Sequence, residues 1–341
     1  MRLPSSPIPI GKLPANLLED LLERYTTADP RVVVGPRVGE DAAIIDMGDR
    51  YLVAKTDPVT FATDEIGWYA VHVNANDVAC TGATPRWFLA TVLLPETGAT
   101  PELAETIFRQ LDEACRQLGV SLCGGHTEIT HGLPRPIVVG QMLGEVAPDG
   151  YVTTSGARVG DALLLTKGIA VEGTAIIARE KEDELRDVLP DAELRRCADF
   201  LHVPGISVVG EARLALEVGG VHALHDPTEG GIATGLWELA QAARVGLTID
   251  EDQLPLLPEC DTLCRHFGLD PLGLIASGSL LIAAAKDRAP AIVGRLCEEG
   301  IPATKIGDVV PAGQGCRVRA ADRSLRPLPT FSRDEITRLF E

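Results

Sequence analysis

Two acidic groups stand at the same end of a predicted β-hairpin, residues 38–61 (VGEDAAIIDMGDRYLVAKTDPVTF). Gly-Asp at positions 48–49 is typical of a two-residue hairpin loop. Counting outward from this loop places Glu40 opposite Asp57, with Asp41 next to this pair. Like charges on paired strands repel each other unless a cation lies between them. The pattern fits either solvated strand ends or a metal site, and the hairpin alone does not decide between them.

A further carboxylate, Asp77, falls on the apolar face of a predicted helix. At about 100° per residue, Asp77 lies in the middle of an apolar stripe, so its side chain is expected to face the interior. An isolated buried charge is costly, so Asp77 must be paired, protonated or bound to a cation. The neighbouring Asn76 is a candidate neutral ligand or orienting group. The stripe consists of Ile66, Tyr69, Ala70, Val73 and Cys80.

A glycine pair follows a predicted buried strand in the segment LCGGHTEIT. Gly124 and Gly125 would let the backbone approach a ligand closely and present N–H groups to an anion. The polar residues His126, Thr127 and Glu128 follow directly. The pattern is also typical of an ordinary turn, and taken alone it favours the turn.

A second glycine pair opens a predicted helix in the segment HDPTEGGIATG. The preceding strand ends at Asp226, and a turn with Thr228 and Glu229 leads to Gly230 and Gly231. The N-terminus of a helix favours anions, so this turn is a candidate phosphate site. As an isolated feature it fits a structural turn equally well.

These residues must be positioned by alternating helices and strands, which predict an α/β (α+β) fold in both halves. The length of 341 residues favours two domains, and we place them at residues 1–155 and 156–341. The elements expected in the first half are the hairpin, a helix from about Ile66, a strand over 86–94, a helix from Thr100-Pro101 to Gly119, and strands over 120–124 and 136–146. Those expected in the second half are strands over 161–166, 221–226, 247–250, 279–285 and, as the final strand, 304–310, with helical segments to about 217 and over 231–244, 259–267 and 289–300.

Composition narrows the classes of function. A net charge of −18 without a Lys/Arg cluster argues against nucleic acid and anionic membranes as partners. No run approaches the roughly 18 apolar residues of a membrane span, so we expect a soluble, cytoplasmic protein. The eight scattered cysteines are expected to be reduced thiols, with Cys80, Cys115 and Cys123 in the core. The spacing of Cys260 and Cys264 matches no common zinc pattern.

Seven segments in order resemble the superfamily of aminoimidazole ribonucleotide synthetase. This superfamily includes thiamine-monophosphate kinase, selenophosphate synthetase and the hydrogenase maturation protein HypE, and the resemblance to HypE is the closest of these. The segments are GKLP, GEDAAII, KTDPVTF, NANDVACTGATP and GGHTEIT in the first half, and DPTEGGIATGLWELA and FGLDPLGLIASG in the second.

The resemblance implies a two-domain fold whose N-terminal strands form a barrel across a homodimer, with ATP and Mg²⁺ near the domain cleft. It implies that Asp41, Asp57 and Asp77 hold Mg²⁺, because carboxylate oxygens suit a hard cation. Lys12 would lie on a segment that closes over the phosphates. The other residues expected to bind ATP are Lys55, Asn76, Gly124, Gly125, Thr127, Gly230 and Gly231, and the expected catalytic residues are His126, Asp226 and Glu229.

The sequence departs from the HypE pattern in two places. His126 stands where HypE-like proteins carry an aspartate. HypE ends in a cysteine that carries the carbamoyl group to be dehydrated, whereas this chain ends ITRLFE, with its last cysteine at Cys316. The first cysteine is Cys80, which argues against selenophosphate synthesis. The HypE carbamoyl carrier therefore has no counterpart at this C-terminus.

The leading hypothesis is an ATP-dependent enzyme that transfers phosphate to a carbonyl or amide oxygen of a small-molecule or protein-borne substrate. One alternative is a kinase similar to thiamine-monophosphate kinase. Another is a non-catalytic nucleotide-binding partner in metallocentre maturation. The apolar strands 86–94 and 136–146 need an edge partner, which favours a homodimer.

Overall fold

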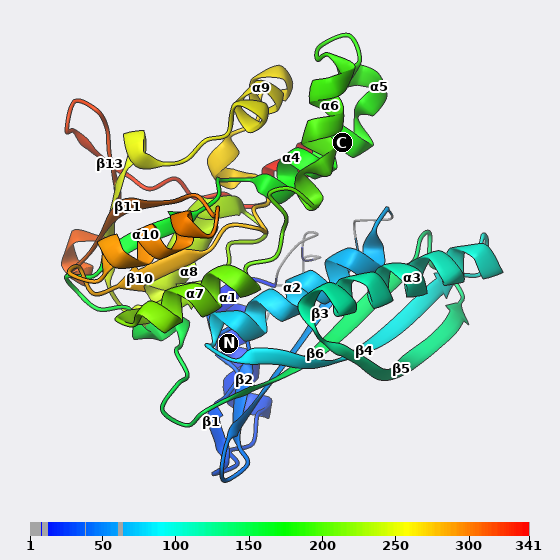
Figure 1. Cartoon of the computed structure of the whole chain (residues 1–341), viewed down its shortest axis with the longest axis horizontal. Helices are drawn as coiled ribbons and strands as arrows, with labels where there is room; N and C mark the ends of the chain where they lie inside the picture. The colour runs from blue at the N-terminus through cyan, green and yellow to red at the C-terminus, as the bar shows by residue number, and fades with distance from the viewer. Residues whose placement is uncertain (1–7, 9–12, 38, 61–63, 341) are drawn as a thin grey trace.

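The computed structural model describes residues 8, 13–37, 39–60 and 64–340. Lys12, an expected ATP ligand, lies outside the described residues. Two β-sheets with their covering helices make up the molecule (Figure 1). None of the helices in the described ranges is both long and apolar enough to cross a membrane.

The N-terminal half contains a six-stranded sheet of order β1-β2-β3-β6-β4-β5, in which only β4 and β5 pair in parallel. Figure 1 shows α2 and α3 lying across one face of this sheet. The elements are α1 (Ala15–Tyr25), β1 (Val32–Val34), β2 (Ala43–Asp46), β3 (Tyr51–Val59), α2 (Ile66–Cys80), β4 (Thr84–Pro95), α3 (Pro101–Leu118), β5 (Ser121–Thr130) and β6 (Ile137–Val146).

The predicted hairpin register is confirmed. Asp46 pairs with Tyr51, and the Met47 N–H donates to the Arg50 carbonyl across the two-residue loop. The paired residues extend outward to Ala43, so the strand pairing ends just before Asp41. The loop therefore brings the acidic ends of β2 and β3 to the same edge, as the count from the turn requires.

Helix α2 is buried on all sides rather than along one stripe. Thirteen of its fifteen residues are buried because it packs between the N-terminal sheet and the C-terminal half, where it contacts α7 and β8. The predicted burial of Asp77 is confirmed, with 4% of its surface exposed. The stripe interpretation was too narrow, since Val73 on that stripe is only partly buried while residues off it are buried.

Strand β5 differs from the prediction of a short buried strand followed by a turn. It continues to Thr130 along β4 and forms the exposed edge of the sheet. Gly124, Gly125, His126 and Thr127 therefore lie within a strand. Cys123 on β5 is exposed, so its assignment to the core was wrong, whereas Cys80 and Cys115 are buried as expected.

The C-terminal half contains a seven-stranded sheet of order β13-β12-β9-β11-β7-β10-β8. Two strands, β12 and β13, follow β11, so 304–310 is not the final strand as predicted. The strands are β7 (Ala162–Thr166), β8 (Val221–His225), β9 (Gly246–Asp250), β10 (Leu281–Ala284), β11 (Ala303–Val310), β12 (Cys316–Arg319) and β13 (Leu325–Pro327). The helices are α4 (Val171–Glu180), α5 (Glu182–Leu185), α6 (Asp191–Ala198), α7 (Val209–Val218), α8 (Gly231–Ala243), α9 (Pro258–Phe267) and α10 (Ala289–Glu298).

One hydrophobic cluster joins the two halves. Ala79 and Cys80, at the end of α2, pack with Leu164 of β7, Leu224 of β8 and Ala212 of α7. The end of α2 therefore lies directly against the strand end that carries His225. This packing brings the acidic groups of the N-terminal half to the edge of the second sheet.

Candidate active site at the junction of the two halves

A lysine and two aspartates form the N-terminal part of the site. Lys55 on β3 places its Nζ 3.2 Å from Oδ2 of Asp77 on α2 and 3.5 Å from Oδ2 of Asp57 on β3. Burial lowers the pKa of Lys55, but the carboxylates of Asp77, Asp57 and Asp41 outweigh it and raise the pKa well above the ordinary value. Lys55 is therefore a fixed positive charge among the carboxylates.

The C-terminal half adds two groups from the end of β8. His225 Nδ1 lies 2.9 Å from Oδ2 of Asp41, and His225 Nε2 lies 3.0 Å from Oε2 of Glu238 on α8. Asp226 follows His225 directly and is 2% exposed. Ligand atoms of Asp41, His225 and Asp226 all lie within 4.8 Å of one another. The two halves thus meet at one cluster of possible metal ligands.

Two buried carboxylate oxygens in this cluster accept no hydrogen bond. They are Oδ2 of Asp77, which has only the ion pair with Lys55, and Oδ2 of Asp226. The other oxygen of Asp226 accepts a hydrogen bond from the Cys80 thiol at 3.4 Å. Buried polar atoms are normally satisfied, so a cation bound here would supply the missing partner. The carboxylate donor set therefore fits Mg²⁺.

The pKa shifts of Asp77, Asp226 and His225 come from burial and from the charges of neighbouring groups. Burial raises the pKa of Asp77 well above its ordinary value, and it raises the pKa of Asp226 to about 7, with Asp41 adding to the effect. Burial lowers the pKa of His225, but Asp41 and Glu238 outweigh burial and raise it. Burial and the repulsion between neighbouring carboxylates both disfavour the charged form of these acids. A divalent cation bound among them would offset this repulsion.

Asn76 has a structural contact on the far side of α2. Its amide donates to the Ile206 carbonyl at 2.8 Å, and its Oδ1 accepts from the Val208 N–H at 2.8 Å. Both polar atoms of the side chain therefore hold the loop that precedes α7. Its predicted role as an ATP ligand remains a prediction that these contacts do not favour.

The residues expected after the first glycine pair lie apart from the acidic cluster. Strands β6 and β4 separate β5 from β3, so a single chain does not bring His126 or Thr127 to Asp57. The His126 side chain is exposed, with Nε2 3.2 Å from Glu128 Oε2. A Cβ on Gly125 would lie 2.0 Å from the Ala90 carbonyl oxygen, so close packing on β4 explains this glycine.

At the second glycine pair, a carboxylate of the chain itself accepts the backbone hydrogen bond expected for a ligand. The Gly230 N–H donates to Asp334 Oδ2 at 2.6 Å, and the Gly231 N–H donates to the Thr228 carbonyl. Glu229 lies exposed at this turn. The anion-binding character predicted for the start of α8 is visible, but the anion is Asp334. The roles of Glu229, Gly230 and Gly231 in binding ATP or in catalysis remain predictions.

Sequence reasoning missed His225 and Glu238 as site residues. The signal for His225 was its position immediately before Asp226 at the end of a predicted buried strand. Glu238 could be identified only after His225, because its contact joins helix α8 to strand β8. Helical spacing alone does not single it out. Both contacts depend on tertiary packing rather than on a local motif.

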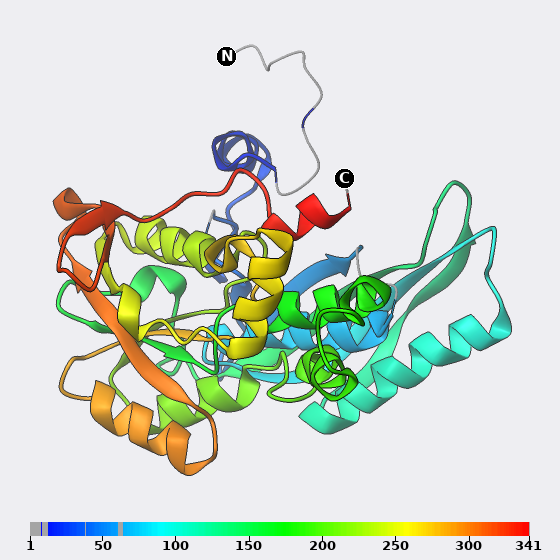
Figure 2. The same cartoon turned by 90° about the horizontal axis from the view of Figure 1, so that it is seen from above.

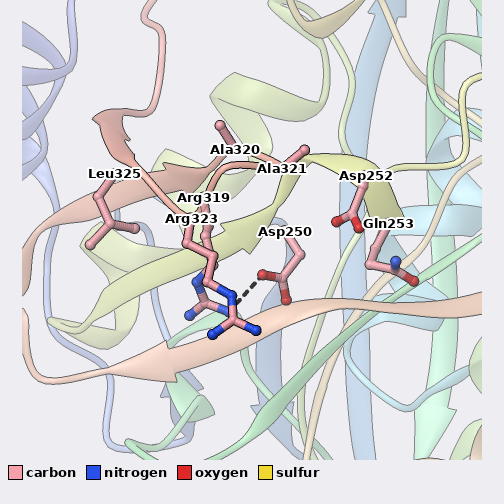
Figure 3. Close-up of a pocket in the computed structure, with 8 residues that line it drawn as sticks. All are labelled: Asp250, Asp252, Gln253, Arg319, Ala320, Ala321, Arg323 and Leu325. Atoms are coloured by element: carbon pink, nitrogen blue, oxygen red, sulfur yellow. Dashed lines mark hydrogen bonds and ion pairs between the residues drawn. The ribbon is translucent and has the colours of Figure 1, made fainter.

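A separate hollow of about 660 Å³ lies at the other edge of the C-terminal sheet, away from β8. The Arg319 guanidinium donates to Asp250 at 2.7 Å across it (Figure 3). Its charged groups balance, with two carboxylates and two guanidiniums. It is lined by Asp250, Asp252, Gln253, Arg319, Ala320, Ala321, Arg323 and Leu325. None of the predicted site residues lines it.

The fold and the junction site define the class of protein: two mixed α/β halves that share one buried acidic cluster. The model of the AIR synthase related protein N-terminal domain matches residues 39–146, and that of the AIR synthase related protein C-terminal domain matches residues 158–318. The chain therefore belongs to the AIR synthase related family, and its relatives named carbamoyl dehydratase and selenide, water dikinase are enzymes.

Within this family the chain is similar to HypE. A protein named carbamoyl dehydratase HypE from Cupriavidus necator is 31% identical over 314 residues, covering 89% of this chain and 86% of that protein. A structure of hydrogenase maturation protein HypE is 28% identical, with a TM-score of 0.72, and covers 92% of this chain and 97% of that one. A structure of HypE in complex with ATP is 25% identical, with a TM-score of 0.71 and coverages of 94% and 91%. The resemblance to HypE is thus confirmed.

Proposed function

We propose that the protein is an ATP-dependent enzyme of the HypE type, which transfers phosphate from Mg-ATP to the oxygen of a carbamoyl or related amide group. The observation that carries this proposal is the convergence of Asp41, Asp57, Asp77 and Asp226 around Lys55, with two buried carboxylate oxygens lacking hydrogen bonds. Similarity to a HypE whose structure contains ATP supports ATP as the nucleotide.

Each residue has a role that follows from its contacts. Asp41, Asp57 and Asp77 would hold Mg²⁺, which when bound neutralises charge on the phosphates. Lys55, kept protonated by these carboxylates, adds a second positive charge for the nucleotide. Asp226, buried beside Asp41 and with a pKa raised to about 7, would accept a proton from the carbamoyl nitrogen.

The proposed reaction balances as a dehydration. The bond between the γ-phosphorus and ADP breaks while a bond from phosphorus to the carbamoyl oxygen forms. The oxygen then leaves as phosphate, the carbamoyl nitrogen gives up two protons, and a nitrile remains. Phosphoryl transfer of this kind depends on positioning and on neutralisation of charge, both of which a buried acidic junction supplies.

We further propose that the chain divides into two domains between residues 155 and 156. We also propose that it forms a homodimer. The side chains of Leu89, Thr91 and Leu93 on β4 are half-buried on the sheet face away from α2 and α3, while β5 leaves an exposed edge. A second copy would cover this apolar face.

All eight cysteines are free, which supports a reducing, cytoplasmic location.

The proposal is tested by ADP release from Mg-ATP in the presence of S-carbamoyl-N-acetylcysteine, a small carbamoyl compound. We expect ADP to appear together with the dehydrated product, identified by mass, and expect Asp57→Asn to abolish both. Binding of Mg-ATP without turnover of any carbamoyl compound would instead favour a non-catalytic nucleotide-binding partner. A phosphorylated product that is not dehydrated would favour a simple kinase.

A further inference from the structure

Asp41 belongs to the N-terminal half by sequence, but its shortest contact is with His225 of the C-terminal half. Its Oδ2 contacts His225 Nδ1 at 2.9 Å and accepts a weaker hydrogen bond from the Thr154 hydroxyl at 3.5 Å. The neighbouring Glu40 accepts from the Ser155 N–H at 3.4 Å. Asp57 and Asp77, by contrast, lie on β3 and α2 of the N-terminal half. The cluster is therefore assembled from both halves.

His225 is fixed on its other side as well. Its ring is 3% exposed, and Nε2 lies 3.0 Å from Glu238 Oε2 on α8. Carboxylates only accept hydrogen bonds, so a ring between two carboxylates donates from both nitrogens. Glu238 thereby sets the plane of the imidazole, and the imidazole sets the position of the Asp41 carboxylate.

The backbone before Asp41 is pressed against the same helix. Gly39 has φ of +88°, and a Cβ built on it would lie 3.1 Å from the Ala242 Cβ and 3.5 Å from the Glu238 carbonyl oxygen. A side chain at position 39 would be strained by this φ and would meet α8. The loop that carries Asp41 therefore packs closely against α8 at Gly39.

We propose that His225 is a positioning residue through which Glu238 and the C-terminal half hold Asp41 in register with Asp57 and Asp77 for the Mg-nucleotide. The inference rests on the proposed function. Groups that hold a metal-binding side chain in place are commonly needed for full metal affinity. Because His225 belongs to the C-terminal half and Asp41 to the N-terminal half, their contact would also make nucleotide binding depend on the packing of the two halves.

The test is a double-mutant cycle on Mg-ATP affinity, measured by calorimetry on the whole chain. His225→Gln should weaken Mg-ATP binding by about tenfold or more, since a glutamine amide reaches the Glu238 position and not the Asp41 position. His225→Asn, whose amide nitrogen replaces Nδ1, should keep most of the affinity. In an Asp41→Asn background, His225→Gln should add little further loss because its partner is already altered.

His222 on the same strand is a matched control. Its Nδ1 contacts Asp161 at 2.9 Å and 3.0 Å, and both residues belong to the C-terminal half. His222→Gln should lower thermal stability without changing Mg-ATP affinity. If His225→Gln leaves affinity unchanged, or weakens it equally with and without Asp41, the positioning role is overturned.

The cycle also separates this inference from the proposed function. Thermal unfolding without ligand should show the same non-additive loss for Asp41→Asn and His225→Gln, because their contact exists in the unliganded protein. If the wild-type chain does not bind Mg-ATP, the proposed function fails while this unliganded cycle still decides the contact. Additive losses in the unliganded protein would contradict the inference directly.

Discussion

Asp77 and Asp226 show how a single residue can point to a ligand. Each is nearly fully buried; Oδ2 of Asp226 has no hydrogen bond, and Oδ2 of Asp77 has only the ion pair with Lys55 at 3.2 Å. A buried polar atom without a partner costs on the order of 1 to 3 kcal/mol, and such atoms are rare in folded proteins. A cation at this point would remove the cost. The two oxygens therefore support the metal site that we propose.

Glu172 on α4 is a buried acid outside the proposed metal cluster. Its Oε2 accepts from the Ser277 N–H at 3.2 Å. Burial raises its pKa from 4.5 to about 7, the Ser277 contact lowers it, and Glu229 and Asp334 raise it. The folded protein thus holds this proton more tightly than the unfolded chain. The resulting contribution to stability is present below about pH 4.5 and is lost as pH rises through 7.

We therefore expect Glu172→Gln to reduce the pH dependence of stability. Between about pH 5 and about pH 8, the wild-type free energy of unfolding should fall by roughly 2 kcal/mol more than that of the variant. Chemical denaturation at the two pH values measures this difference. Glu113→Gln, at an exposed position, is the control, and an identical pH dependence in wild type and Glu172→Gln would contradict the assignment.

At the residue scale, the sequence predicts what local geometry determines. Counting from a two-residue turn gave the hairpin register that brings Asp41 and Asp57 to one edge, and helical spacing gave the burial of Asp77. The contacts of His225 and Glu238 could not be predicted, because they join β8, α8 and the loop before β2. Such contacts depend on how the two sheets pack, which no short spacing encodes.

At the element scale, α2 organises the site. One side of it packs on the first sheet, while Tyr69 and the C-terminal residues Ala79 and Cys80 pack on the second half. A helix buried on all sides shows weak amphipathic periodicity, which explains why a single apolar stripe was too simple an interpretation. Two of the polar residues along it have these roles: Asn76 holds the loop before α7, and Asp77 faces the cluster.

The open face of the N-terminal sheet leads to a prediction about assembly. We expect light scattering at micromolar concentration to give twice the 36.3 kDa of one chain, because a half-exposed apolar sheet face and an exposed edge strand favour pairing. Leu89→Asp on β4 should yield monomers. Leu325→Asp, at an exposed position on β13, should not. A monomeric wild-type protein would contradict the proposed dimer.

Strand β5 shows the limit of sequence interpretation for elements. Its end was expected to be a turn because two glycines followed an apolar segment, and the family resemblance implied that this turn binds ATP. In the structure those glycines continue a strand, since the close contact between Gly125 and Ala90 requires a residue without Cβ. Glycine pairs mark close backbone approach, and the sequence alone does not say whether a ligand or another strand approaches.

At the scale of the whole molecule, the C-terminal segment ties the second half together. Figure 2 shows it running past α8 to end beside α9. Pro329 accepts from the Trp237 indole, and Asp334 accepts from the N–H groups of Gly230 and Ile275. The segment from Pro329 to Asp334 is therefore packed onto the second half.

The central claim is that the junction of the two halves binds Mg-ATP through Asp77 and its neighbouring carboxylates. The most direct measurement is a set of paired thermal unfolding curves for wild type and Asp77→Asn, each with and without Mg-ATP. Ligands that bind only the folded state raise its melting temperature, and the rise is larger the tighter they bind at a given concentration. Without ligand, removal of one charge from crowded carboxylates should leave stability unchanged or raised.

We predict that Asp77→Asn keeps or exceeds the wild-type melting temperature without ligand and loses most of the rise that Mg-ATP produces. This outcome would follow from relief of repulsion combined with loss of a metal ligand. A large loss of stability without ligand, together with an intact Mg-ATP shift, would show that Asp77 is only the buried structural partner of Lys55 and would contradict the account.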